Sequence, residues 1–232
     1  MMDWIREQLS GRRSRTTGVV YLLYFLTAIL GAVVMPGNAN DIAAHQTLFR
    51  WGFAVSTISL GLYVAMTVLF YRLFTRVNRS VALLAAFFGL MGCALQAVGS
   101  LFQLAPLVVL GGTQYKGAFN PDQLHAMAQI LLDLSVQAWY IGIVFFGVFD
   151  FVIGYLIIRS IFLPHALGVL MMLAGLGWLI FLSPALANSV LIPIEVLGFV
   201  AELALMLWLV AVGVNVERWT AQGRLAEASV TT

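Results

Sequence analysis

The chain has 232 residues, of which 62% are hydrophobic and only 9% are charged. Soluble globular domains carry about a quarter charged residues, and the mean hydropathy of +0.97 indicates more apolar surface than a compact chain can hide from water. The composition therefore excludes a cytosolic enzyme and a secreted module, and it predicts a protein solvated by lipid. The single cysteine, Cys93, excludes an intramolecular disulfide and a zinc site built from cysteines.

Six stretches of the chain are long and apolar enough to cross a bilayer, because a spanning helix needs about 20 mostly apolar residues. They cover residues 17–35, 51–74, 81–105, 139–158, 164–182 and 195–214. The breaker cluster Pro36-Gly37-Asn38 stops the first stretch, Pro106 ends the third, and Pro164 is well placed as the first residue of the fifth. The sequence thus predicts an all-α polytopic membrane protein with six transmembrane helices in one domain.

Basic residues are distributed unevenly between the connecting segments. When the segments are counted alternately, one side holds ten arginines and the other holds only Arg50 and Lys116. Positively charged loops remain in the cytoplasm. We therefore expect both termini to be cytoplasmic and the loops 36–50, 106–138 and 183–194 to be external.

The basic residues before the first stretch also leave open a cleaved signal peptide. Its apolar part is about 19 residues long, whereas a signal core has about 7–15. The length favours a retained transmembrane helix.

The segments outside the spans have their own expected structures. Residues 1–15 are expected to form a cytoplasmic amphipathic segment on the membrane surface, residues 16–215 the six-helix domain, and residues 216–232 a cytoplasmic polar tail. Short external interfacial helices are predicted before the second and fourth spans. Asn40 or Asp41 can cap the first of them, and Asn120-Pro121-Asp122-Gln123 combines the cap, proline and glutamine signals of the second. That second helix, continuous to residue 158, would be about 57 Å long and must protrude or bend.

Polar residues within the spans should face the bundle interior, because they are costly in hydrocarbon. Two stripes at helical spacing stand out. They are Gly52, Ser56, Ser59, Tyr63 and Thr67 in the second span, and Gly89, Gly92 or Cys93, Gln96, Ser100 and Gln103 in the third. Such residues either hold helices together by hydrogen bonds and close approach, or they contact a ligand.

Counting residues from the cytoplasmic ends places several polar side chains in the outer half of the membrane or just below it. They are Arg50, Gln96, Gln103, Asp133, Gln137, Tyr140, Glu195 and Glu202. The leading interpretation is an outward-facing polar cavity that binds or passes a small amphipathic or lipid-like molecule. Arg50 would fix an anionic group, or pair with Asp133 or Glu195, and the amides would orient the ligand.

Two other classes of function remain open. The chain could be a non-catalytic accessory subunit of a larger membrane complex, with Gly168 and Gly175 on one helix face as a close-packing surface. It could also be an intramembrane enzyme that uses Glu202 or Asp133 as an acid or base. A proton relay through Glu202 and Asp150 is a further alternative. Asp150 lies about 100° around its helix from Asp133 and Tyr140, so we expect it to face another helix.

No catalytic motif is present, so no catalytic residue is assigned. His45 and His125 lie near acidic residues but lack ligand spacing, so no metal and no other cofactor is predicted. The expected partners are membrane lipid, a small amphipathic ligand, and a larger complex or a homo-oligomer; nothing indicates nucleic acid.

Short motifs along the chain carry a resemblance to a known family. They are Leu48-Phe49-Arg50, Asn78-Arg79-Ser80, Ala82-Leu83-Leu84-Ala85, Phe119 with Pro121 and Gln123-Leu124, Leu132-Asp133, Ile141-Gly142, Phe145-Phe146-Gly147, Gly154-Tyr155-Leu156, Arg159-Ser160, Phe162-Leu163-Pro164, Leu167-Gly168-Val169, Leu173-Ala174-Gly175, Glu202-Leu203 and Leu207-Trp208-Leu209. Over nearly the whole span region the chain resembles an uncharacterised bacterial family of integral membrane proteins, domain of unknown function number 4386. The resemblance implies a multi-helix protein of the bacterial inner membrane, and no established activity, substrate or catalytic residue.

Two positions depart from the pattern of that family. Relatives often carry a charged residue where this chain has Gly89, and a histidine after the aspartate where this chain has Ser135. An activity that depended on those groups would be lost or altered here.

Overall fold

The computed structural model describes residues 2–35, 38–112, 115 and 117–228, and this part of the chain contains helices and no strands. The elements are α1 (Met2–Val34), α2 (Ala39–Ala44), α3 (Gln46–Phe74), α4 (Arg79–Gln103), α5 (Ala105–Gly111), α6 (Pro121–Arg159), α7 (His165–Trp178), the 3₁₀ helix η1 (Leu179–Leu182), α8 (Pro184–Ala211) and α9 (Val216–Ala228). Six helical segments within these are long and apolar enough to cross a membrane. The predicted all-α protein with six spanning helices is therefore confirmed.

Caps and prolines place several helix ends differently from the sequence expectation. The side chain of Asn38 caps α2 by accepting from the backbone N–H of Asp41 at 2.9 Å, and the predicted cap positions 40 and 41 lie within the helix. Pro106 does not end the helical path of the third span; it lies in the first turn of α5, which follows α4 after one residue. Proline at this position loses no hydrogen bond, because the first-turn N–H groups have no intrahelical partner.

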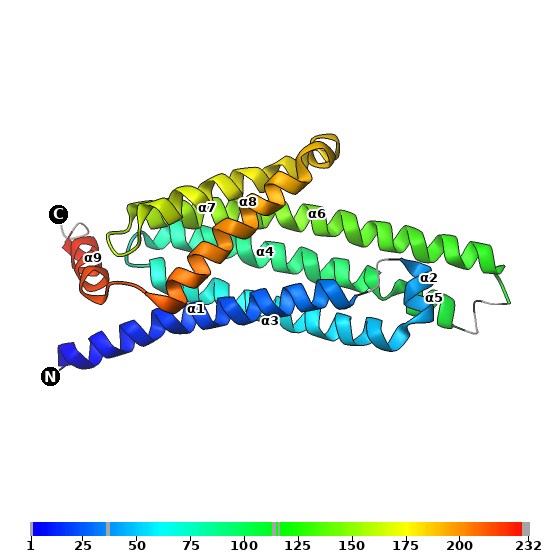
Figure 1. Cartoon of the computed structure of the whole chain (residues 1–232), viewed down its shortest axis with the longest axis horizontal. Helices are drawn as coiled ribbons and strands as arrows, with labels where there is room; N and C mark the ends of the chain where they lie inside the picture. Colours follow the sequence, from blue (N-terminus) through cyan, green and yellow to red (C-terminus); the bar gives the residue numbers. More distant parts are fainter. Residues whose placement is uncertain (1, 36–37, 113–114, 116, 229–232) are drawn as a thin grey trace.

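The predicted start of α6 is confirmed in detail. Asn120 accepts from the backbone N–H of Gln123, and the Gln123 side chain accepts from the N–H of Asn120, which completes a capping box. The helix then runs for 39 residues without interruption. Figure 1 shows it extending past the other spanning helices at the end away from the chain termini.

Each spanning helix packs against two others, and together they close a ring in the order α1, α3, α4, α6, α7, α8. Both chain termini lie at one end of this ring, here called the terminal end (Figure 1). The opposite end, where α2 and α5 pack against α6, is called the far end.

The α6–α7 pair is held at very short range by four glycines. A Cβ atom added to Gly168 would lie 2.7 Å from the carbonyl oxygen of Gly154, and one added to Gly175 would lie 2.5 Å from that of Gly147. Any other residue would force these backbones apart. Gly168 and Gly175, considered above as a surface for a partner protein, are thus used within the chain.

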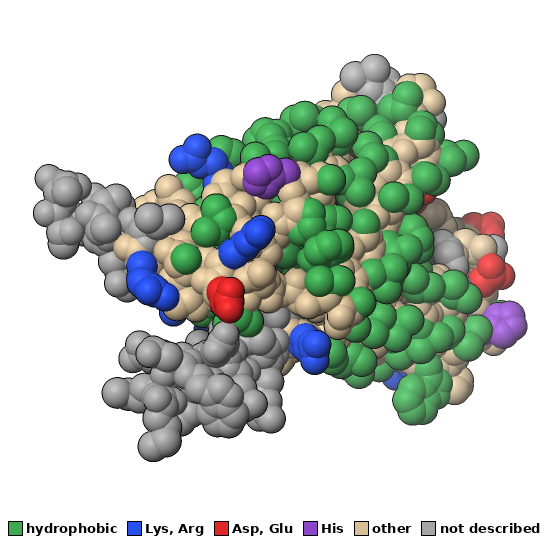
Figure 2. Space-filling model, turned by 60° about the vertical axis from the view of Figure 1, so that its left-hand side comes forward, with side chains coloured by type: hydrophobic (Ala, Val, Ile, Leu, Met, Phe, Trp, Pro, Cys, Tyr) green, Lys and Arg blue, Asp and Glu red, His purple; other side chains and the backbone are tan. Residues whose placement is uncertain are grey.

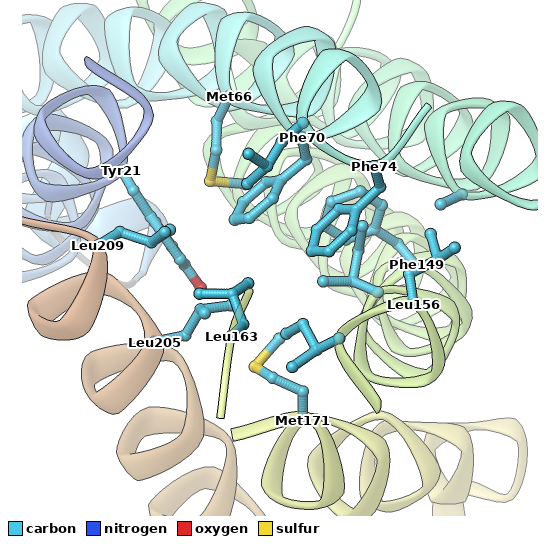
Figure 3. Close-up of a cluster of buried hydrophobic side chains, with 14 of the residues drawn as sticks. Tyr21, Met66, Phe70, Phe74, Phe149, Leu156, Leu163, Met171, Leu205 and Leu209 are labelled. Carbon is cyan, nitrogen blue, oxygen red and sulfur yellow. The ribbon is translucent and has the colours of Figure 1, made fainter. Parts of the chain in front are cut away.

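The interior toward the terminal end is filled by large apolar side chains. Phe70 and Phe74 of α3 meet Leu156 of α6, Met171 of α7 and Leu205 of α8, all almost fully buried (Figure 3). The cluster fills the centre of this part of the bundle with apolar side chains. The name apolar plug is used below for these five residues.

The segment expected as a polar tail contains a docked helix. Asn215 caps α9 by accepting from the N–H of Arg218 at 3.0 Å. The buried indole of Trp219 donates its Nε1–H to the carbonyl oxygen of Leu73 at 3.1 Å, and the Arg76 guanidinium lies 3.8 Å from the ring centre. Residues 2–15 belong to α1, but the amphipathic face predicted for this segment lies on side chains 1–14, outside those that are described.

The outer surface is apolar around the middle of the molecule. Val33 is 78% exposed, and Leu182 and Ile192 are each 73% exposed. Figure 2 shows hydrophobic side chains covering the middle, with basic side chains gathered toward one end. Water would solvate such a belt poorly, whereas lipid chains match it.

Candidate functional site

A cavity of about 280 Å³ lies among four helices in the half of the bundle nearer the far end. Its walls combine amide and hydroxyl groups with aromatic and aliphatic side chains. They comprise Tyr24, Ala28, Gly31, Ala32 and Met35 of α1; Ser56, Ser59, Leu60 and Tyr63 of α3; Gln96, Gly99, Ser100 and Gln103 of α4; and Ser135, Trp139 and Phe146 of α6. None of these side chains is charged.

The path of α8 explains why the cavity is open on one side. Near the terminal end α8 touches α1, where Gly18 lies against the backbone of Leu209 and Val210. Toward the far end it leaves α1 for α7, and Ile194 packs on Gly177 (Figure 1). Because α8 leans away, none of its described residues lines the cavity, so this helix leaves the side between α1 and α6 uncovered.

The two glutamine side chains of the cavity make no hydrogen bond to any other described residue. The serines differ, since Ser100 donates to the carbonyl oxygen of Gln96 at 2.9 Å and Ser135 to that of Leu132 at 2.7 Å. An amide kept from water without a partner costs about 1–3 kcal/mol. The carboxamides of Gln96 and Gln103 are therefore free to bind water or the polar group of a ligand.

The inner end of the cavity is aromatic. The rings of Tyr24 and Tyr63 meet edge to face with centroids 4.9 Å apart, and Tyr63 also packs on Phe146 at 4.5 Å. Gly92 of α4 leaves the room that the Phe146 ring occupies. The polar part of the cavity thus ends at two tyrosines.

Two acidic side chains lie beyond those tyrosines. Asp150 of α6 is 3% exposed, and it interacts electrostatically with Glu202 of α8. The Tyr21 side chain of α1 neighbours Glu202 and interacts with it electrostatically. Figure 3 shows the Tyr21 side chain reaching from α1 toward Leu205, which is one turn of α8 from Glu202. We call Asp150 and Glu202 the acid pair.

The eight residues proposed from the sequence do not share one site in the structure. Gln96 and Gln103 line the cavity, and Glu202 belongs to the acid pair. Tyr140 packs on Phe181, with ring centroids 5.2 Å apart, outside the cavity. Asp133 is exposed and accepts from the Gln129 side chain of its own helix at 2.9 Å.

The remaining three, Arg50, Gln137 and Glu195, are exposed and contribute nothing to the cavity wall. The expected ion pair of Arg50 with Asp133 or Glu195 is not formed in the described part of the chain. Arg50 is on a different face of α3 from Ser56, so it does not reach the cavity amides.

The two polar stripes divide along their length. Ser56, Ser59 and Tyr63, together with Gln96, Ser100 and Gln103, line the cavity. The members nearer the terminal end serve packing instead: a Cβ atom on Gly89 would lie 3.1 Å from the Thr67 side chain. The packing interpretation therefore holds for the members nearer the terminal end, and ligand contact stays a prediction for the members that line the cavity.

The contribution of α1 was missed by sequence reasoning. Tyr21 and Tyr24 are three residues apart in the first span, a spacing that places them on one helix face. A pair of tyrosines within an apolar span, away from its ends, could have indicated that this helix face meets polar groups. Tyr21 and Tyr24 lie between the cavity and the acid pair.

Comparison with known proteins identifies the family. No curated protein and no solved structure matches the chain. Residues 16–213 match the family described as Domain of unknown function (DUF4386), which covers all six spanning helices and both the cavity and the acid pair. This match extends over most of the 232 residues, and the chain belongs to that family.

Proposed function

We propose that the protein binds a small amphipathic molecule in the cavity between α1, α3, α4 and α6. The observation that carries this proposal is the pair of free carboxamides, Gln96 and Gln103, that face the cavity of about 280 Å³. In a membrane bundle such groups need a polar partner. A ligand with hydroxyl, amide or ester groups supplies both the donors and the acceptors that they lack.

The charge of the walls indicates the kind of head group. With no cation among the lining residues, an anionic group would lose its hydration without compensation. The ligand head is therefore neutral, which revises the expectation that Arg50 fixes an anion.

The size and the side opening indicate the rest of the ligand. Pockets for drug-sized ligands enclose about 300–1,000 Å³, so this cavity holds a head group and little more. An apolar tail would pass along Met35 and Trp139 through the opening between α1 and α6 into lipid. We place the cavity in the outer half of the membrane, because the arginine asymmetry favours cytoplasmic termini.

The test is native mass spectrometry of the protein extracted with its surrounding lipid and without overexpression. We expect the wild type to carry a reproducible small-molecule mass. Q96L/Q103L should lower its occupancy at least about tenfold, because two hydrogen bonds of about 1 kcal/mol each are lost. Gln137→Leu is the matched control, since Gln137 is exposed and outside the cavity.

Equal occupancy in the Q96L/Q103L variant and the wild type would overturn the proposal. Other polypeptides in fixed ratio, with no small molecule bound, would also overturn it and would favour an accessory subunit of a larger complex.

A further inference from the structure

The acid pair has acidic and hydroxyl neighbours but no basic one. The groups that interact electrostatically with Asp150 or Glu202 are each other and three tyrosines: Tyr21 and Tyr24 of α1, and Tyr63 of α3. From α4, Cys93 acts on Tyr24. The neighbouring part of α7 contributes apolar residues such as Met171 and Ala174. No arginine, lysine or histidine of the described residues is among these groups.

Two carboxylates in such a place repel each other strongly, because a low-dielectric interior screens charge poorly. Like-charged carboxyl groups at one site therefore titrate together, and one keeps its proton while the other ionises. We propose that Asp150 and Glu202 form a proton-binding site that holds one shared proton and exchanges it with the cavity through the hydroxyls of Tyr24 and Tyr63.

The surroundings favour a proton over a metal cation as the occupant. Calcium takes six to eight oxygen ligands and magnesium six, and no group of three or more His, Cys, Asp and Glu side chains occurs in the described residues. Phe149, Ile153 and Leu205, all buried, fill the space around the acids. Asp150 is 3% exposed and Glu202 is partly exposed, so the pair lies at the edge of the apolar interior and not in bulk water.

The route to the site starts in the cavity. Tyr24 and Tyr63 are both cavity-lining residues and both interact electrostatically with Asp150 and Glu202. The Ser59 hydroxyl donates to the carbonyl oxygen of Tyr24 at 3.4 Å, so a further hydroxyl group lies beside the two tyrosines. On the other side the apolar plug closes the path. The site therefore communicates with one side of the protein only.

The chemistry of this step is a simple proton transfer. A proton from cavity water adds to a carboxylate oxygen and forms an O–H bond, and the same bond breaks when the proton leaves. No oxidant, reductant or other reactant is needed. This proposal is separate from ligand binding, and it does not depend on whether the cavity holds an amphipathic molecule.

The first test is infrared spectroscopy of the protein in lipid nanodiscs during a pH titration. We expect the C=O stretching band of a protonated carboxyl group to be present at neutral pH and to disappear with the loss of one proton per chain at higher pH. D150N/E202Q should abolish the band, and the single variants D150N and E202Q should each shift it. Glu195→Gln, at an exposed position of α8, should leave it unchanged.

Three results would overturn the proposal. They are the absence of the band in the wild type at neutral pH, its survival in D150N/E202Q, and its loss on adding sodium chloride at constant pH, which would assign the site to a metal cation. If the double variant does not fold, an unshifted band in both single variants would have the same consequence.

The second test addresses the route. On transfer to D₂O the band shifts as the proton exchanges for a deuteron, and Y24F/Y63F should slow this exchange at least about tenfold without removing the band. Tyr155→Phe, on the exposed face of α6, is the matched control. An exchange rate equal to that of the wild type would exclude the tyrosines from the path.

Discussion

The indole of Trp219 ties the last described helix to the membrane-spanning bundle. Its Nε1–H is bonded to the carbonyl oxygen of Leu73, a group near the end of α3 that has no intrahelical partner. Trp219→Phe should lower the free energy of unfolding by about 1 kcal/mol through loss of that bond. Trp219→Ala should lower it by about 3–5 kcal/mol, because the buried ring is also lost.

Thermal unfolding in detergent, together with the rate of tryptic cleavage within α9, measures both effects. Glu217→Ala is the control, because Glu217 lies exposed on the same helix. Unchanged stability in the Trp219→Ala variant would show that α9 does not dock as described.

Asn120 determines where the longest helix begins. Replacing it with alanine removes the acceptor for the Gln123 N–H and should cost about 1 kcal/mol. Hydrogen exchange of the first-turn amides of α6 should then accelerate about fivefold. Asn120→Asp retains an acceptor oxygen and should exchange like the wild type; the same acceleration in both variants would contradict the capping assignment.

Individual residues were predictable where a local rule decides them. The capping box of Asn120 and Gln123 depends on neighbours within three residues, so sequence spacing reveals it. The inward position of Gln96 and Gln103 likewise follows from the cost of an amide in lipid. Arg50 and Glu195 lie near the ends of their spans, where water or lipid head groups can solvate a charge, so the same rule does not apply to them.

The α6–α7 pair depends on small residues over its whole length. Gly175→Leu would drive a side chain into the backbone of Gly147 and Phe151, so it should lower the melting temperature or prevent folding, since overpacking costs about 1–3 kcal/mol or more. Gly61→Leu is the matched control, because nothing lies within 4 Å of a Cβ atom there.

The readout for this pair is thermal unfolding in the same detergent. A Gly175→Leu variant as stable as Gly61→Leu would show that α6 and α7 are not in backbone contact.

Helix ends at the far end were the least predictable elements. A search for about 20 apolar residues finds the spans but not the short α5, and it placed the start of the sixth span at residue 195 although α8 begins at Pro184. The backbone of Val190 departs from helical geometry. Pro193 explains the break, because its ring clashes with the carbonyl group four residues earlier and it donates no hydrogen bond.

The protein should be oriented in the membrane with both termini in the cytoplasm, because the arginines gather at the terminal end. Asp122→Cys, at the start of α6, should react with a membrane-impermeant maleimide on intact cells. Glu217→Cys, in α9, should react only after permeabilisation. The native Cys93 is buried, so it should add little labelling of its own. The opposite labelling pattern would reverse the orientation.

The arrangement of the helices around the ring was beyond sequence reasoning, and with it most of the site. Apolar faces of different helices are chemically alike, so they do not specify which helix lies beside which. The meeting of Asp150 with Glu202, and the position of Tyr21 and Tyr24 between them and the cavity, depend on that order. The cavity-lining residues of α3 and α4 could be predicted, because they recur at helical spacing along each span.

The apolar plug has a consequence for the cell that makes the protein. Phe70, Phe74 and Leu156, packed with Met171 and Leu205, place a layer of apolar side chains between the acid pair and the compartment at the terminal end. A proton that enters through the cavity must therefore also leave through the cavity. Many copies could thus occupy a membrane without short-circuiting the electrochemical gradient on which the cell depends for its energy.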